Sequence, residues 1–84
     1  MTAELDALLD ERVRSVADWP VPGVTFRDIT PLLADPRGLP AVVAGIVAGI
    51  AEAGFGPIDL VAGIEARGFV LGAPLAVELG VGFV

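Results

Sequence analysis

Residues 58–84, I-D-L-V-A-G-I-E-A-R-G-F-V-L-G-A-P-L-A-V-E-L-G-V-G-F-V, decide the fold class of this chain. They begin with an apolar run of strand length (58–64), and a polar turn with a glycine follows (65–68). Residues 69–79 have the composition of a helix that ends at a glycine, and 81–84 begin another apolar run. Strand, tight turn, helix and strand form a βαβ unit, which predicts parallel strands buried on both faces and an α/β fold.

Upstream of this unit the chain predicts a helix and a stiff connector. Apolar residues recur at helical spacing over 3–17, with Thr2 as the expected N-cap. Two prolines within 19–23 impose non-helical geometry there. Residues 24–31 alternate only loosely, so either a short strand or a structured loop fits them.

Residues 36–53 predict a second helix, with Asp35 as its N-cap and Gly54 at its end. It is apolar almost all round, which favours burial on several sides. Gly45 and Gly49 interrupt it and suggest close packing against a neighbouring element.

Composition excludes several classes of protein. The 84 residues contain no cysteine and no histidine, which rules out a disulfide, a zinc site built on these residue types and a histidine general base. The net charge is −6, with five arginines and no lysine, and this argues against a nucleic-acid partner. The longest uncharged run, 38–51, is too short for a membrane span, and the acidic first 20 residues do not fit a signal peptide. We therefore expect no membrane association and a cytoplasmic location.

The turn after the first predicted strand is one candidate site. Ligands of open α/β sheets bind beyond the carboxyl ends of the strands, which here is Ile64–Gly68. Amides at a helix N-terminus favour an anion, Arg67 adds a fork of donors, and Gly68 leaves room for the ligand. An ordinary strand-to-helix turn with solvated Glu65 and Arg67 is the alternative.

The segment Phe26-Arg27-Asp28, beside the proline-rich connector, is a second candidate. An aromatic ring on a rigid loop can stack on a planar ligand, and loop backbone groups can bind the ligand's edge. A core Phe26 with an Arg27–Asp28 surface pair is the alternative, and from this segment alone it is the favoured one.

Two longer strings link these candidates. P-G-V-T-F-R-D-I-T-P-L-L at 22–33 and V-A-G-I-E-A-R-G-F at 61–69 closely resemble segments of the adenine phosphoribosyltransferases. The resemblance runs from about Val13 to the last residue. It implies part of a type I phosphoribosyltransferase fold, a mostly parallel sheet with helices on both faces and a hood over the base. We expect a single partial domain over 1–84, with the N-terminal helix and the hood in 1–35 and the start of an incomplete α/β core in 36–84.

The resemblance also implies an activity and its substrates. The family transfers the 5-phosphoribosyl group of phosphoribosyl pyrophosphate to adenine, giving AMP and pyrophosphate in purine salvage, with Mg²⁺ bound to the pyrophosphate substrate. By resemblance, Phe26 stacks on adenine, and backbone groups of Thr25 and Arg27 bind the purine edge. The resemblance further implies a homodimer in the full-length family.

A pyrophosphate site follows from the second string. By resemblance it comprises Glu65, Ala66, Arg67 and Gly68, with Arg67 holding the pyrophosphate and a cis peptide between Glu65 and Ala66. No catalytic side chain and no metal ligand is identified in the chain.

One family motif has no match in these 84 residues. The ribose-phosphate loop is an acidic pair followed by a Thr-Gly-Gly-Thr-like turn, whereas Asp10-Glu11, the only adjacent acidic pair, falls in the first predicted helix. The chain is thus expected to be truncated and unable to turn over alone. The main alternative is a non-catalytic fragment that docks to a complementary or full-length chain. A regulatory purine sensor and an unrelated anion-binding domain are weaker alternatives.

Overall fold

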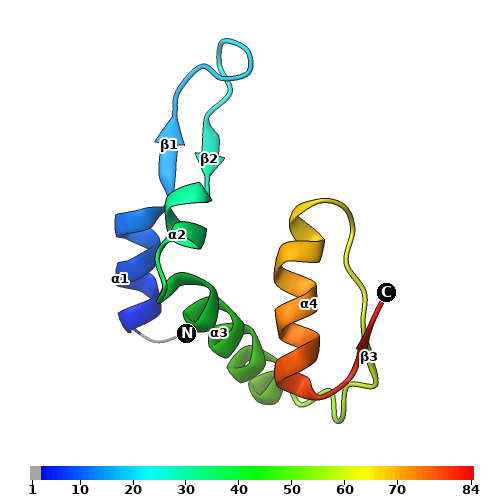
Figure 1. Cartoon of the computed structure of the whole chain (residues 1–84). Coiled ribbons are helices and arrows are strands. Elements are labelled where there is room, and N and C mark those ends of the chain that lie inside the picture. The colour runs from blue at the N-terminus through cyan, green and yellow to red at the C-terminus, as the bar shows by residue number, and fades with distance from the viewer. Residues whose placement is uncertain (1–2) are drawn as a thin grey trace.

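A computed structural model describes residues 3–84, so the N-cap expected at Thr2 lies outside the described residues (Figure 1). The elements, in chain order, are α1 (Ala3–Arg12), β1 (Arg14–Val16), β2 (Phe26–Asp28), α2 (Thr30–Ala34), α3 (Gly38–Ala53), β3 (Leu60–Val61), α4 (Arg67–Leu79) and β4 (Gly82–Phe83).

The first helix is shorter than its pattern predicts. Leu5 and Leu8 on α1 are buried, but α1 ends at Arg12 and the predicted helical segment 13–17 is wrong. Residues of that segment form β1, which pairs antiparallel with β2. A strand partner from beyond the connector supplies hydrogen bonds that compete with the helix, so tertiary pairing overrides the local periodicity.

The connector between β1 and β2 is non-helical, as its prolines predict, and it closes a hairpin. The Trp19 amide donates to the Val24 carbonyl over 3.0 Å, and the Gly23 amide donates to Asp18 Oδ1 over 2.9 Å. Gly23 has φ +87°, a conformation that a glycine adopts without strain. Of the two readings for 24–31, the strand is the one observed at β2. Figure 1 shows the hairpin projecting clear of α1 and α2.

The corner between α2 and α3 replaces the predicted helix start at 36. The five-residue helix α2, absent from the sequence-based expectations, ends at Ala34 with Asp35 as its C-cap, and α3 begins at Gly38. Asp35 Oδ1 accepts a hydrogen bond from the Arg37 amide at 2.9 Å. Asp35 therefore stabilises the turn between α2 and α3, whereas the expected role was the N-cap of a helix that starts at residue 36. A Cβ on Gly38 would lie 1.9 Å from the Leu32 carbonyl oxygen, so the corner requires a glycine.

Helix α3 links the two halves of the molecule (Figure 1). It packs against α1, α2 and α4 and ends, as predicted, at Gly54 with φ +70°. The prediction that this helix is buried on several sides is wrong, because within α3 only Gly38 and Val43 are buried. The close packing suggested for Gly49 is also wrong, since this glycine is exposed and an added Cβ would meet nothing within 4 Å.

The predicted βαβ unit is confirmed. Strands β3 and β4 are parallel, with Leu60 opposite Gly82, and α4 connects them. The Val84 amide donates to the Val61 carbonyl over 2.9 Å. Gly80 ends α4 with φ +71°, as predicted, and Pro74 is accommodated inside the helix.

Helix α4 covers one face of this two-stranded sheet. Phe69 and Phe83 meet edge to face, with ring centroids 5.9 Å apart, and a Cβ on Gly72 would lie 2.5 Å from Phe83 Cε1. The opposite face is open, because Leu60 is 53% exposed and Ile64 is 87% exposed. Burial of the strands on both faces is therefore wrong, since α4 is the helix of residues 3–84 that packs against them.

The molecule is extended for its length. Its principal dimensions are 42 × 28 × 24 Å and its radius of gyration is 14.4 Å, against about 12 Å for a compact domain of this size. The hairpin at one end and the β3–α4–β4 unit at the other account for this shape (Figure 1). Among residues 3–84 no helix combines the length and apolar character needed to cross a bilayer.

Candidate functional site

The turn from β3 into α4 presents backbone amides at the start of a helix. The Glu65–Ala66 peptide is cis, as the resemblance implies. Ala66 is the N-cap and no side chain caps the helix, while the Phe69 amide already donates to the Ala66 carbonyl over 3.2 Å. Uncapped amides in the first turn of a 13-residue helix favour an anionic ligand.

Two glycines give this turn its shape. A Cβ on Gly63 would lie 2.5 Å from the Gly68 carbonyl oxygen, and a Cβ on Gly68 would lie 3.1 Å from the Gly63 carbonyl carbon. Gly68 therefore allows close approach of Gly63, whereas its expected role was to leave room for a ligand. Gly63 was missed as a site-shaping residue, although its place at the end of an apolar run was a usable signal.

Arg67 is the arginine whose guanidinium has no hydrogen-bonding partner among residues 3–84. All five arginines lie in the described range, and the other four make side-chain hydrogen bonds: Arg12 and Arg37 to Asp35, Arg14 to Asp28, and Arg27 to Ser15. Arg67 is exposed and makes no side-chain hydrogen bond or ion pair there. Its guanidinium is thus available to an anion at the turn.

The structure brings the two predicted sites together. The guanidinium carbon of Arg67 lies 5.4 Å from the centroid of the Phe26 ring, within the range of a cation–π contact. Trp19 packs against the same ring, edge to face, with centroids 4.8 Å apart and planes at 64°. A base subsite at Phe26 and an anion subsite at the turn would therefore adjoin each other.

The ring of Phe26 borders a pocket of about 220 Å³ on one face of the hairpin, lined by Arg14, Val16, Trp19, Phe26 and Asp28. Thr25 is exposed just before β2. The Arg27 side chain does not reach Asp28, because it donates to Ser15. The alternative of an Arg27–Asp28 surface pair is therefore wrong.

Asp28 pairs instead with Arg14, whose Nη2 lies 2.5 Å from the carboxylate. The Thr30 backbone amide and the Thr30 hydroxyl donate to the carboxylate, Arg14 adds its charge, and together they lower the pKa of Asp28. The carboxylate is thus ionised at neutral pH and its charge is matched within the pocket wall.

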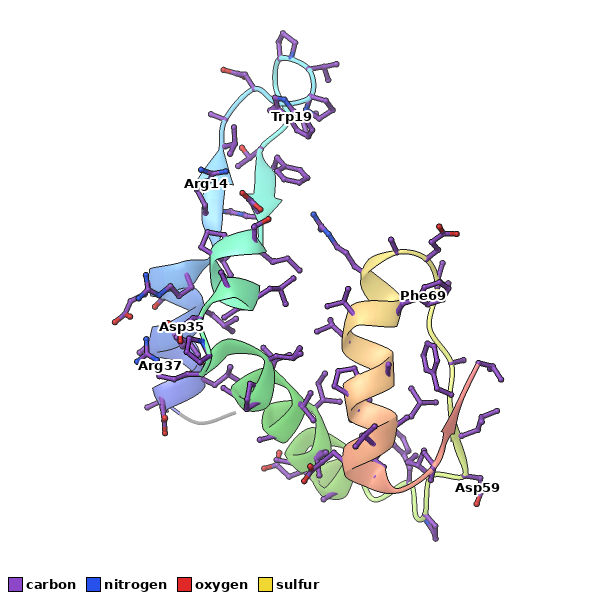
Figure 2. All side chains as sticks on the ribbon, in the orientation of Figure 1. Arg14, Trp19, Asp35, Arg37, Asp59 and Phe69 are labelled. Atoms are coloured by element: carbon purple, nitrogen blue, oxygen red, sulfur yellow. The ribbon has the colours of Figure 1, made fainter. Side chains whose placement is uncertain are left out.

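Trp19 was missed as a site residue. Its position in the sequence indicates only a connector residue, because closure of the loop, and no spacing along the chain, brings its ring to Phe26. Figure 2 shows Trp19 at the outer end of the hairpin and Phe69 near the first turn of α4.

The Phe26 ring, the Arg67 guanidinium and the amides at the start of α4 can bind and orient a ligand. None of these three groups is a nucleophile. Residues 3–84 contain no group of three or more His, Cys, Asp or Glu side chains placed to hold a metal ion. The described part of the chain thus offers an aromatic ring, a free guanidinium and helix amides, which suit a planar group joined to a phosphate-bearing group.

Curated sequences with a clear likeness to this chain are adenine phosphoribosyltransferases. The Cupriavidus taiwanensis protein is 53% identical over 81 residues, which are 96% of this chain and 41% of that protein. The Bordetella avium protein is 51% identical over 84 residues, which are 100% of this chain and 44% of that protein. The chain therefore spans about two fifths of the length of these relatives. No family model matches it.

Solved structures agree with the sequences. Adenine phosphoribosyltransferase from Saccharomyces cerevisiae, solved with an imino-altritol bisphosphate and adenine, superposes with a TM-score of 0.89 at 31% identity. The match covers 99% of this chain and 50% of that one. The Rhodothermus marinus enzyme gives a TM-score of 0.81 at 40% identity, covering 99% of this chain and 46% of that one.

The fold and these likenesses place the chain among the phosphoribosyltransferases. Within that family it matches the N-terminal portion of the adenine phosphoribosyltransferases, in sequence and in three-dimensional structure.

Proposed function

We propose that this chain carries the base-binding and pyrophosphate-binding part of an adenine phosphoribosyltransferase, which converts adenine and phosphoribosyl pyrophosphate to AMP and pyrophosphate. The observation that carries the proposal is the position of Arg67. Its guanidinium has no acidic partner and lies 5.4 Å from the Phe26 ring centroid, so one residue adjoins both subsites.

Each subsite has a distinct task. Phe26 stacks on the purine, and the backbone groups of Thr25 and Arg27 bind its edge. The residues Glu65, Ala66, Arg67 and Gly68 form the turn whose amides and guanidinium hold the pyrophosphate. As the bond from ribose to pyrophosphate breaks, negative charge grows on the leaving group, and Arg67 with the α4 amides stabilises that charge.

Mg²⁺ would enter with the substrate. The described residues do not form a metal cage, and Mg²⁺ commonly retains its waters and binds through substrate phosphates. The ion supplies charge neutralisation on the diphosphate, while this chain supplies amides and one guanidinium.

The same proposal covers the organisation of the chain. Residues 1–84 form one partial domain, with 1–35 as the N-terminal helix and hood and 36–84 as the start of the α/β core. A homodimeric full-length enzyme in the cytoplasm completes the proposal, on the basis of the family resemblance.

A second candidate function is docking to a complementary chain without catalysis by these residues. The exposed sheet face favours it, since Leu60, Ile64 and Val84 are 53%, 87% and 65% exposed. Apolar side chains gathered beside an open strand edge favour association with another polypeptide.

Calorimetric titration with pyrophosphate tests the role of Arg67. We expect Arg67→Ala to weaken binding about tenfold to a hundredfold, because a hydrogen bond to a charged group contributes about 1.5–3 kcal/mol. Arg37→Ala is the matched control, since it removes the same charge from a residue paired with Asp35. Equal weakening in both variants would mean that net charge, and not the turn, binds the anion.

A further inference from the structure

The indole of Trp19 is held in place by the loop that carries it. The Trp19 amide donates to the Val24 carbonyl over 3.0 Å, and the Val24 amide donates to the Val21 carbonyl over 3.3 Å. The Gly23 amide donates to Asp18 Oδ1, which ties the start of the loop to its end. Trp19 is therefore anchored through its backbone although its side chain is 52% exposed.

The ring of Phe26 lies outside the buried apolar core of the described chain. Phe26 is half-buried, at the start of β2, and its cross-strand neighbour is Val16. The hairpin that carries Phe26 projects clear of α1 and α2 (Figure 1). Among residues 3–84, the Trp19 indole and the Arg67 guanidinium make the aromatic and cation–π contacts with this ring.

An aromatic ring that stacks on a flat ligand must present its face in one orientation. A phenylalanine ring on a two-stranded hairpin turns about χ1 and χ2 unless neighbouring atoms restrict it. The Trp19 contact, at 4.8 Å and 64°, has edge-to-face geometry, which aromatic quadrupoles favour. A contact of this geometry restricts rotation of the Phe26 ring.

We propose that Trp19 is a positioning residue of the base subsite, which sets the orientation of Phe26 and thereby the affinity for the purine. This proposal rests on the proposed function, because it assumes that Phe26 stacks on adenine. Trp19 acts through Phe26, so its loss weakens the base subsite and leaves the anion subsite at residues 65–68 intact.

Two variants separate the ring contact from bulk. Trp19→Leu keeps an apolar side chain without an aromatic edge, whereas Trp19→Phe keeps an edge. Val21→Ala is the matched control, since Val21 lies in the same loop and is exposed to a similar extent, 53%. Circular dichroism checks that all variants keep their helical content.

Adenine and pyrophosphate binding to the whole chain are then measured separately by equilibrium dialysis. We expect Trp19→Leu to bind adenine about three- to tenfold more weakly, the size of one aromatic edge-to-face contact. Trp19→Phe and Val21→Ala should stay within about twofold of the parent chain. Pyrophosphate affinity should be the same in all four proteins.

The chain has one tryptophan, so its fluorescence reports on the subsite directly. We expect adenine to change the emission of Trp19, and the proton resonances of the Phe26 ring to move in Trp19→Leu even without ligand. A Trp19→Leu variant that binds adenine like the parent overturns the positioning role and leaves the proposed function standing. Loss of pyrophosphate binding in the same variant also overturns it, because the defect is then a general structural one.

Two further outcomes are decisive. If Trp19→Phe binds adenine as weakly as Trp19→Leu, an aromatic edge is not what orients Phe26, and the inference is wrong. If the parent chain binds pyrophosphate but shows no adenine binding, the base subsite itself is wrong and the inference falls with that half of the proposed function.

Discussion

At the scale of single residues, Asp35 joins the start of α3 to α1. Its side chain is only 9% exposed and accepts hydrogen bonds from Arg37 Nη2 at 2.8 Å and Arg12 Nε at 3.1 Å. The Arg37 side chain and the Arg37 amide lower the pKa of Asp35 well below its usual range, and the charge of Arg12 adds to this. The folded state therefore binds a proton at Asp35 less readily than the unfolded chain does.

This difference predicts acid sensitivity. Because the pKa of Asp35 is lower in the folded state, its contribution to stability is present above the unfolded pKa of about 4 and is lost as the pH falls below it. We expect the midpoint temperature of thermal unfolding to decrease as the pH is lowered from 5 to 3. Asp35→Asn should lower the midpoint at pH 7 and reduce its further fall on acidification.

Asp59→Asn is the control, since Asp59 is an exposed carboxylate at the other end of the molecule in Figure 2. It removes one negative charge without removing an Asp35 contact. An acid profile of Asp35→Asn that matches the parent would show that other carboxylates, such as Asp28, dominate the response.

At the scale of elements, a glycine in α3 and a glycine in α4 differ in the space around them. Gly49 in α3 faces open space, whereas Gly72 in α4 brings that helix close to Phe83 of β4. An interior helix glycine costs about 0.5–1 kcal/mol relative to alanine unless a neighbour needs the space. Replacing the glycine by alanine should therefore raise the free energy of unfolding in α3 and lower it in α4.

We predict that Gly49→Ala stabilises the chain by about 0.5–1 kcal/mol. Gly72→Ala should destabilise it by about 1–3 kcal/mol, because its Cβ would lie 2.5 Å from Phe83 Cε1 and force that ring to move. Urea unfolding of each variant measures both effects. Stabilisation by Gly72→Ala would mean that the α4–β4 contact is looser than described.

At the scale of the whole molecule, the described chain has a small core beside exposed apolar surface. Its buried apolar side chains are Leu5, Leu8, Leu32, Val43, Val61 and Ala76. Leu60, on the open face of a two-stranded sheet, is 53% exposed. A sheet of this size gains stability only when further strands or helices cover it.

We predict that this chain alone forms no AMP from adenine and phosphoribosyl pyrophosphate. Adding the separately produced C-terminal part of the Bordetella avium relative should raise the unfolding temperature and yield AMP, because that part would cover the open face. Leu60→Glu should reduce both the rise in unfolding temperature and the yield of AMP. Val21→Glu, in the loop of the hairpin, should change neither. AMP formation by the chain without a partner would contradict the prediction.

The sequence was sufficient for features that depend on neighbouring residues. Gly54 and Gly80 end their helices in the left-handed conformation, and the order of strand, turn, helix and strand leads to parallel pairing. The two motif strings identify the family because they are long and specific. These features follow from local backbone preferences and from the rule that a helical crossover joins parallel strands.

Tertiary structure decided what depends on residues far apart in the chain. Segment 14–16 became a strand because Phe26–Asp28 was available to pair with it, although its own periodicity favours a helix. Asp35 caps a corner because Arg12 and Arg37 converge on it. The guanidinium of Arg67 and the ring of Phe26 meet because α4 packs on α3, which places the first residue of α4 within reach of the hairpin. That placement depends on the packing of whole helices and on no local preference.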